Sequence, residues 1–326
     1  MPPSEVQVSR LTKMGDSSGF RDGSKGGYDQ DHSGEHPRSP KGPGGEMAVA
    51  SVIIPAHNEA SSIVRCLSAL RDGTSPGQLE VIVVCNGCTD DTAQVARRAD
   101  PRVRVIEIDM PSKSEAVRVG NASTTLFPRV HVDADIELSG TALLALIEPI
   151  RRGEALATAP VRNIPLAGCS RWVRWYYDVW VALPQVQAGL FGRGVVALSA
   201  PAQARVEHLA GMMSDDLGLS DEFDHAERRV VAGAVAVVRP PRTLSDLLKR
   251  RVRVATGNVQ AARMGARRDS SRTTLRTLLR VAVAQPGVAV RLPVFVTVWA
   301  IATVRARGAV RSGDFETWQR DESSRT

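Results

Sequence analysis

The sequence is poor in aromatic residues and in cysteine, and it has no long apolar run. Phe, Trp and Tyr make up 4% of its 326 residues, so a local crowding of aromatic side chains is informative. Four cysteines are too few for the disulfide framework of a secreted protein and favour a reducing compartment. No stretch reaches the roughly 18–20 apolar residues of a transmembrane helix, and the first residues lack the apolar core of a signal peptide. Neither a membrane-spanning protein nor a disulfide-stabilised scaffold is expected.

Positive charge is concentrated in the last quarter of the chain. The net charge is +7, yet residues 239–326 hold 18 Lys and Arg against 6 Asp and Glu, which gives +12 there and −5 elsewhere. A basic segment suits nucleic acid, anionic lipid or a phosphate-bearing substrate. Nucleic acid is the poorest match, because no aromatic side chains are interleaved with these arginines.

Composition divides the chain into three parts. Residues 1–46 are rich in Gly, Ser, Pro and Asp and lack core-forming side chains, so we predict a disordered tail. Residues 47–260 are predicted to form the main domain. Residues 261–326 are predicted to form a basic, partly apolar helical extension.

Strands and helices alternate through the first part of the main domain. Apolar, β-branched runs at 52–54, 79–87, 102–109 and 129–138 predict buried strands, and each is followed by a segment of helical periodicity. The fourth of these helices has Ser139 as its expected cap. Four such repeats predict an α/β fold with a mostly parallel sheet flanked by helices.

Polar residues follow the predicted strands. His57, Asn58 and Glu59 follow the first strand, Asn86 ends the second, and acidic residues end the fourth. In parallel sheets ligands bind at the carboxyl ends of the strands. We therefore expect these side chains to meet in one crevice.

The acidic pair Asp133 and Asp135 suggests a metal site. Side chains two apart in a strand point the same way, so both carboxylates are expected to face one site. Two close carboxylates repel unless a cation lies between them, and Mg²⁺ or Mn²⁺ takes oxygen ligands and bridges to phosphates. The alternative is a solvated strand end.

Two further sequence features bear on redox, zinc and dinucleotide-binding functions. Cys85 and Cys88 have the spacing of a redox or zinc pair, but no second pair completes a four-cysteine zinc site and the flanking residues do not resemble a redox helix. No G-x-G-x-x-G follows the first strand, which argues against a dinucleotide-binding domain.

Six segments, in order, resemble the motifs of the inverting GT-A glycosyltransferases of family 2. They are VIIPAHNE, CNGCTDDT, PSKSEAVRVGNA, DADIEL, SDDLGLSDEF and KRRVRVATGN, and they cover about residues 50–260. The resemblance implies transfer of a sugar from a nucleoside-diphosphate sugar, with a UDP-sugar favoured, to a saccharide, lipid-linked or small-molecule acceptor.

The family resemblance also implies site residues. The nucleotide-sugar contacts are Pro55, His57, Glu59, Asn86, Asp90, Lys113, Asp133, Arg250 and Arg253. Asp135, with Asp133, would hold Mg²⁺ or Mn²⁺ as cofactor. The catalytic base would be Asp216, with Asp215 as second choice.

The chain departs from the family pattern at two positions. Asn86 stands where the family often has an aspartate, and Val254 replaces a tryptophan. These departures leave open an inactive sugar-nucleotide-binding or scaffold protein. A nucleotidyltransferase fits less well, because it normally carries a Gly-rich, basic loop after the first strand.

The aromatic cluster and the C-terminal quarter allow alternatives. One face of a predicted helix carries Trp172, Trp175, Tyr176 and Trp180. These rings are interpreted either as core that also forms a wall of the acceptor site, or as an aromatic belt at a membrane interface. The apolar pieces 281–290 and 292–304 are too short to span a bilayer and suit helices lying on an anionic membrane surface. The alternative packs Phe295, Val298 and their neighbours on the main domain. The expected location is the cytoplasm, either free or peripheral on the inner face of the cell membrane.

Overall fold

The computed structural model of the protein describes residues 48–207, 216–263 and 273–312. Its strands are β1 (Ala50–Ala56), β2 (Leu79–Asn86), β3 (Arg104–Ile108), β4 (Arg129–Val132), β5 (Glu137–Leu138), β6 (Ala157–Asn163), β7 (Val195–Leu198) and β8 (Arg228–Val237). Its helices are α1 (Ile63–Arg71), α2 (Thr92–Ala99), α3 (Lys113–Ala122), α4 (Gly140–Arg151), α5 (Arg171–Ala182), α6 (Pro184–Ala188), α7 (Ala200–Val206), α8 (Asp216–Glu222), α9 (Leu244–Arg263), α10 (Leu275–Ala284), α11 (Pro286–Ala289) and α12 (Leu292–Ser312).

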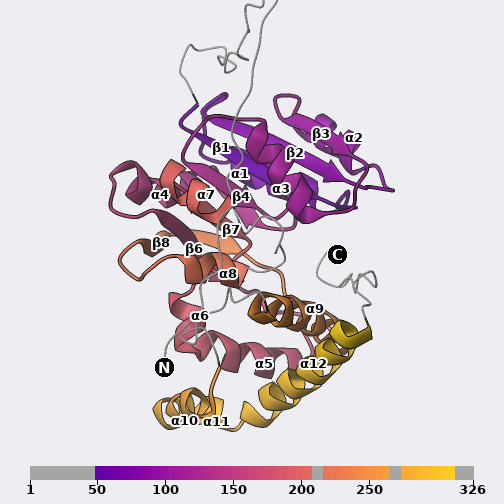
Figure 1. Cartoon of the computed structure of the whole chain (residues 1–326), viewed down its shortest axis with the longest axis vertical. Helices are drawn as coiled ribbons and strands as arrows, with labels where there is room; N and C mark the ends of the chain where they lie inside the picture. The colour runs from indigo at the N-terminus through magenta and orange to yellow at the C-terminus, as the bar shows by residue number, and fades with distance from the viewer. Residues whose placement is uncertain (1–47, 208–215, 264–272, 313–326) are drawn as a thin grey trace, which may run out of the picture. The chain divides into compact units, whose positions relative to one another are not determined.

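All eight strands of the described residues belong to one sheet, in the order β3-β2-β1-β4-β7-β6-β8-β5 (Figure 1). β1 pairs in parallel with β2 and β4, and β2 pairs in parallel with β3, which confirms the predicted arrangement of the first strands. β7 is antiparallel to both β4 and β6, and β5 is antiparallel to β8. The sheet is therefore mixed, and β7 enters it between strands that precede it in the chain.

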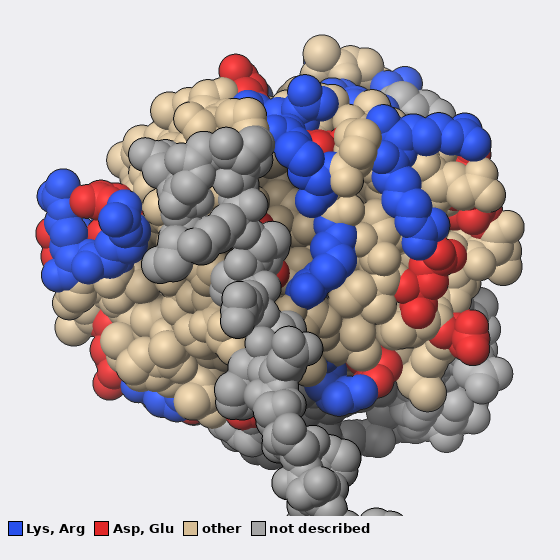
Figure 2. Space-filling model, turned by 90° about the horizontal axis from the view of Figure 1, so that it is seen from above, with Lys and Arg blue, Asp and Glu red and all other residues tan. Residues whose placement is uncertain are grey.

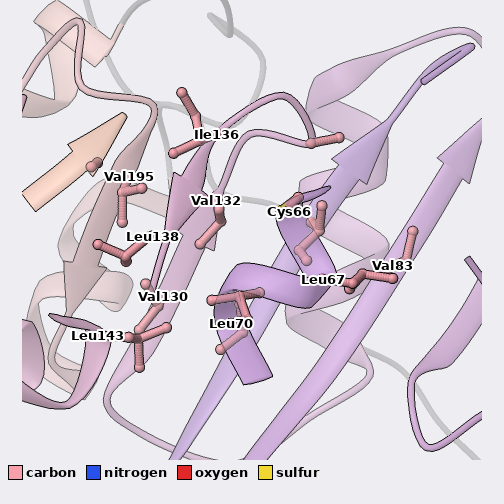
Figure 3. Close-up of a cluster of buried hydrophobic side chains, with 14 of the residues drawn as sticks. Cys66, Leu67, Leu70, Val83, Val130, Val132, Ile136, Leu138, Leu143 and Val195 are labelled. Carbon is pink, nitrogen blue, oxygen red and sulfur yellow. The ribbon is translucent and has the colours of Figure 1, made fainter. Parts of the chain in front are cut away.

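Both faces of the sheet are covered by helices. On one face, Cys66, Leu67 and Leu70 of α1 lie against side chains of β2 and β4, among them Val83 and Val130 (Figure 3). On the other face, Ala116 of α3 packs with alternate residues of β2. Because side chains alternate along a strand, the β-branched runs supply apolar groups to both layers, as the sequence predicted.

Local signals set the starts of the helices. The Ser139 hydroxyl accepts a hydrogen bond from the Ala142 N–H at 3.1 Å, which confirms this cap. Helix α2 begins after Asp91, which is its N-cap residue. The Asp90 carboxylate accepts a hydrogen bond from the first helical N–H, of Thr92, at 3.1 Å. Asp90 therefore accepts a hydrogen bond from an N–H group that has no partner within the helix, although Asp90 is not the N-cap residue.

A second group of helices packs beside the sheet. In Figure 1, α5, α9 and α12 lie together, and their apolar side chains share one buried cluster. The rings of Tyr176 and Phe295 stack with centroids 5.1 Å apart. Of the four aromatic residues predicted on one helix face, Tyr176 is buried and Trp172, in the first turn of α5, is exposed. Trp175 and Trp180 are half-buried. None of the described helices combines the length and apolar character that a membrane crossing requires.

Gly120 allows α3 to lie close to β1. A Cβ atom placed there would meet Cγ2 of Ile53 at 2.4 Å. We expect Gly120→Ala to lower the free energy of unfolding by about 1–3 kcal/mol, because overpacking outweighs the gain of about 1 kcal/mol in helix propensity. Gly308 in α12 is the matched control, since a Cβ there would meet nothing within 4 Å. Urea unfolding followed by circular dichroism measures both variants, and equal stabilisation by the two substitutions would contradict this packing.

Candidate active site

Loops from four strands meet at one edge of the sheet. The carboxyl ends of β1, β2 and β4 point to this edge because these strands are parallel, and β7 begins there because it runs antiparallel to β4, with Val195 opposite Val132. Loops 57–62, 87–91 and 133–136 therefore follow strands at the edge where the crevice was predicted. The start of β7 adds the loop 189–194, which the sequence analysis did not assign to the site.

The loop after β1 is tied to the loop after β2 by hydrogen bonds. His57 Nδ1 lies 2.5 Å from the carbonyl oxygen of Asn86. Asn58 has a positive φ of 52°, a conformation that asparagine tolerates better than most residues. Its side-chain oxygen accepts hydrogen bonds from the N–H groups of Thr89 at 2.7 Å and Asp90 at 3.3 Å. Asn58 is therefore the residue that joins the two loops, although the sequence analysis assigned it no role.

Glu59 and Asp90 complete this connection. The Glu59 N–H donates to the Thr92 hydroxyl at 2.8 Å, and the Asp90 carboxylate accepts from the Ala60 N–H at 3.2 Å. The buried Glu59 carboxylate also accepts a hydrogen bond from Ser62 at 2.5 Å. These predicted contact residues hold the shape of the site. Pro55 lies within β1, buried opposite Val84, because the strand continues to Ala56.

The acidic pair lies in a turn and not in a strand. β4 ends at Val132, and the Ile136 N–H donates to the Asp133 carbonyl oxygen at 3.1 Å, which closes a tight turn. The expectation that Asp133 and Asp135 face one side through strand alternation is therefore wrong. The turn forms here because the Asp133 N–H bonds to the Gly194 carbonyl oxygen at 2.8 Å, while Ile136 is buried beneath.

Both carboxylates act on one buried thiol. Burial raises the pKa of the Cys66 thiol, and the negative charges of Asp135 and Asp133 raise it further. Glu137 and Glu59 act on the same thiol in the same direction. The Cys66 sulfur lies 3.9 Å from the Asp133 carbonyl oxygen, which places α1 beside the acidic turn.

Basic side chains pair with these acids. The Lys113 ammonium, in the first turn of α3, forms an ion pair with the Asp133 carboxylate. Arg239 pairs with Glu137 at 2.7 Å, and its carbonyl oxygen accepts a hydrogen bond from the Arg250 guanidinium at 3.1 Å. Arg239 and Glu137 thus connect the basic helix α9 to the acidic turn, which the sequence analysis did not predict. Arg253 lies one turn further along α9.

The loop 189–194 is held by a buried arginine. The Arg193 guanidinium donates to the carbonyl oxygens of Gly189, Pro160 and Gln187 at 2.9, 2.8 and 2.7 Å. Burial lowers the pKa of Arg193 to about 10. Gly194, at φ 64°, has no space for a side chain, because a Cβ would meet Ile136 Cγ1 at 2.4 Å. In the sequence, the signal for this close approach of Gly194 to Ile136 is the cluster of glycines at 189, 192 and 194.

The acidic helix α8 lies next to this loop. The Ser220 hydroxyl accepts a hydrogen bond from the Leu190 N–H at 3.0 Å, and Asp221 is buried. Asp216 is the first residue of α8, and Asp215 lies outside the described residues. One hydrogen bond therefore links the helix that begins at the predicted base to the loop that supports the acidic turn.

The four cysteines are free thiols. The Cys88 sulfur lies between the first two loops, 3.4 Å from the Asn58 N–H and 3.5 Å from the Ala56 carbonyl oxygen. Hydrogen bonding from Cys85 lowers the pKa of Cys88. On the face shown in Figure 2, Lys and Arg side chains gather beside Asp and Glu side chains, so both signs of charge are exposed there.

Residues 51–189 match the family model described as glycosyl transferase family 2. Among curated proteins, the chain is 44% identical over 63 residues to glycosyltransferase AglE of Haloferax volcanii, covering 19% of this chain and 21% of that protein. It is 33% identical over 118 residues to an uncharacterized glycosyltransferase of Mycobacterium tuberculosis, covering 36% of this chain and 50% of that protein. The matches thus span half or less of these relatives' length.

A solved structure shares the fold. The mannosyltransferase PcManGT of Pyrobaculum calidifontis, in complex with GDP-Man and Mn²⁺, matches 83% of this chain and 77% of its own with a TM-score of 0.54 and 19% sequence identity. Its likeness covers the mixed sheet and the flanking helices. The likeness shows a shared fold of the GT-A type, and residues 51–189, less than half of the chain, match glycosyltransferase family 2 in sequence.

Proposed function

We propose that the protein is an inverting glycosyltransferase that moves a sugar from a nucleoside-diphosphate sugar to a saccharide, lipid-linked or small-molecule acceptor. The observation that carries the proposal is the meeting of the loops after β1, β2 and β4, with Asp133 of the acidic turn paired with Lys113. Nucleotides bind at this edge of parallel sheets. A UDP-sugar is the first candidate donor, and the GDP-Man complex of the mannosyltransferase makes GDP-Man the second.

The nucleoside is proposed to lie against the first two loops. Asn86 would contact the base or ribose, since an amide both donates and accepts hydrogen bonds. His57, whose ring contacts the Asn86 backbone, lies beside this position. Pro55, Glu59 and Asp90 would hold the pocket through the strand pairing and hydrogen bonds described above.

The diphosphate is proposed to lie over the acidic turn. In the described part of the chain, no group of three or more His, Cys, Asp and Glu side chains is gathered to hold an ion. Asp135 with Asp133 offers oxygen donors that fit Mg²⁺ or Mn²⁺, the remaining ligands being phosphate oxygens and water. Such a cation, when bound, would offset the charge of the leaving diphosphate. Lys113, Arg250 and Arg253 would add positive charge there.

A carboxylate must take the proton of the acceptor hydroxyl as the new bond forms at the anomeric carbon. We propose Asp216 for this role, with Asp215 as the alternative. The support is the position of α8, which begins at Asp216 and is bonded through Ser220 to the loop that contacts the acidic turn.

The place of the reaction is proposed to be the cytoplasm, at an anionic membrane surface. The free thiols support a reducing compartment, because disulfides form and persist in oxidising ones. The basic C-terminal quarter supports a negatively charged surface as partner. Nucleic acid is not proposed as a partner.

Release of the nucleoside diphosphate from a panel of nucleotide sugars, with and without Mn²⁺, tests the proposed activity. We expect metal-dependent release with one donor, accelerated by the acceptor. Binding of a nucleotide sugar without any release would instead assign the chain as an inactive binding or scaffold protein, the alternative that Asn86 and Val254 keep open.

The acidic turn gives a prediction for metal binding. Asp135→Asn keeps the shape of the side chain but removes its charge, so we expect Mn²⁺-dependent binding of UDP to weaken by at least about tenfold. Calorimetric titration measures this, with Glu107→Gln, an exposed acid that pairs with Arg97, as the control. A titration of Asp135→Asn that matches the unmodified protein would refute the metal assignment.

The start of α8 gives a prediction for the base. Asp216→Asn removes the proton acceptor, so transfer should fall by about 10²–10⁴ while donor binding persists. Initial rates of transfer and a parallel binding titration separate the two effects. If Asp216→Asn transfers normally and Asp215→Asn does not, the base is the preceding residue.

A further inference from the structure

Helix α10 carries an apolar stripe that faces away from the protein. Leu275, Leu279 and Val283 are 78%, 66% and 82% exposed, although each is a large apolar residue. They are four residues apart, so they lie on one side of the helix. The opposite side is used for packing, because Val281 is buried in the cluster that α5 and α12 share, with Leu278 beside it. The helix is thus anchored on one side and unpartnered on the other.

Another exposed apolar side chain follows in the sequence. Val290, which follows α11, is 72% exposed. Contiguous exposed apolar side chains of this kind mark surfaces that contact a partner or a membrane. A single exposed Leu or Val would need no such explanation.

Within residues 273–312 every charged side chain is an arginine. Arg276 and Arg280 each follow a stripe residue by one position, so they lie along its side. Residues 273–312 contain six Arg and no Asp, Glu or Lys. This differs from the face in Figure 2, where acidic and basic side chains are exposed together. An apolar stripe bordered by arginine complements a surface that is apolar inside and anionic outside.

Helix α12 does not offer its main apolar face in the same way. Phe295 and Val298 are buried, and Phe295 stacks on Tyr176. Arg291, just before α12, pairs with Asp178 of α5 at 2.6 Å. The packed alternative considered for segment 292–304 therefore holds for Phe295 and Val298. Val296, Trp299 and Val304 of α12 are 39%, 49% and 69% exposed. The two most exposed large apolar side chains of the described residues, Val283 and Leu275, belong to the stripe on α10.

We propose that α10 docks the protein on an anionic lipid bilayer, with Leu275, Leu279 and Val283 at the acyl boundary and Arg276 and Arg280 at the head groups. A helix of 10 residues extends only about 15 Å, half the hydrocarbon thickness, so it lies in the interface and does not cross it. This inference rests on the membrane part of the proposed function and is independent of sugar transfer.

Flotation of the full chain with lipid vesicles tests the proposal without any nucleotide sugar. We expect recovery with vesicles of phosphatidylcholine and phosphatidylglycerol, little with phosphatidylcholine alone, and a decrease as salt screens the charges. The double variant Leu279→Glu/Val283→Glu should lower the partition to anionic vesicles by at least about tenfold. Arg276→Gln/Arg280→Gln should remove most of the salt-sensitive part.

The matched control is Val64→Glu/Val235→Glu, which changes two exposed valines of α1 and β8 and adds the same charge. It should float as the unmodified protein does. Circular dichroism checks that both double variants are folded, which is expected because all four positions are exposed. Equal flotation of the two double variants would overturn the assignment to α10. Equal recovery with neutral and anionic vesicles would overturn the charge component.

A second copy of this chain is the other candidate for covering the stripe on α10, and light scattering tests for such a dimer. If the unmodified protein does not float but forms a dimer that Leu279→Glu/Val283→Glu dissociates, the stripe is an interface between two copies and the membrane proposal is wrong. Nucleotide-sugar turnover by the same variants is measured separately, so loss of flotation with unchanged turnover leaves the proposed activity standing.

Discussion

The site depends on one backbone contact, the hydrogen bond of 2.8 Å from the Asp133 N–H to the Gly194 carbonyl oxygen. It exists because β7 enters the sheet antiparallel to β4 and begins where β4 ends. The contact continues the pairing of β4 with β7 by one residue, immediately before the turn that Ile136 closes on Asp133, and it holds the loop 189–194 beside this turn. Through Leu190 that loop also positions α8. A side chain at Gly194 would separate these parts, since Ile136 occupies the space.

The residues that follow β1 and β2 have structural tasks that overlap with their proposed functional ones. Asn58, Asp90 and Thr92 join the two loops into one rigid rim by donating to or accepting from backbone groups. A rim held in this way costs little reorganisation when a ligand binds, which is the benefit of preorganisation. A substitution at Asp90 would therefore alter both loop geometry and binding, whereas Asp135 has less influence on the fold.

The C-terminal helices divide their apolar surface between two uses. Phe295 and Val298 of α12 pack in the cluster around Tyr176. From α10, Val281 and Leu278 pack there. Hydropathy along the chain is similar in both helices, so it does not separate them. The difference arises from which side of each helix meets α5, and this is a property of the packed molecule.

Sequence by itself determined the alternation of strands and helices as far as α4, the cap at Ser139, the carboxyl-edge location of the polar residues and the family motifs, because each rests on local periodicity or on short spacing. It read Asp133 and Asp135 as part of one continuous strand, it gave no specific partner for Asn58, and it missed Arg193 and the Arg239–Glu137 pair. Those features join residues far apart in the chain: Glu137 and Arg239 are 102 positions apart. Only the tertiary structure decided them, since the insertion of β7 and the docking of α9 depend on long-range pairing that no local pattern encodes.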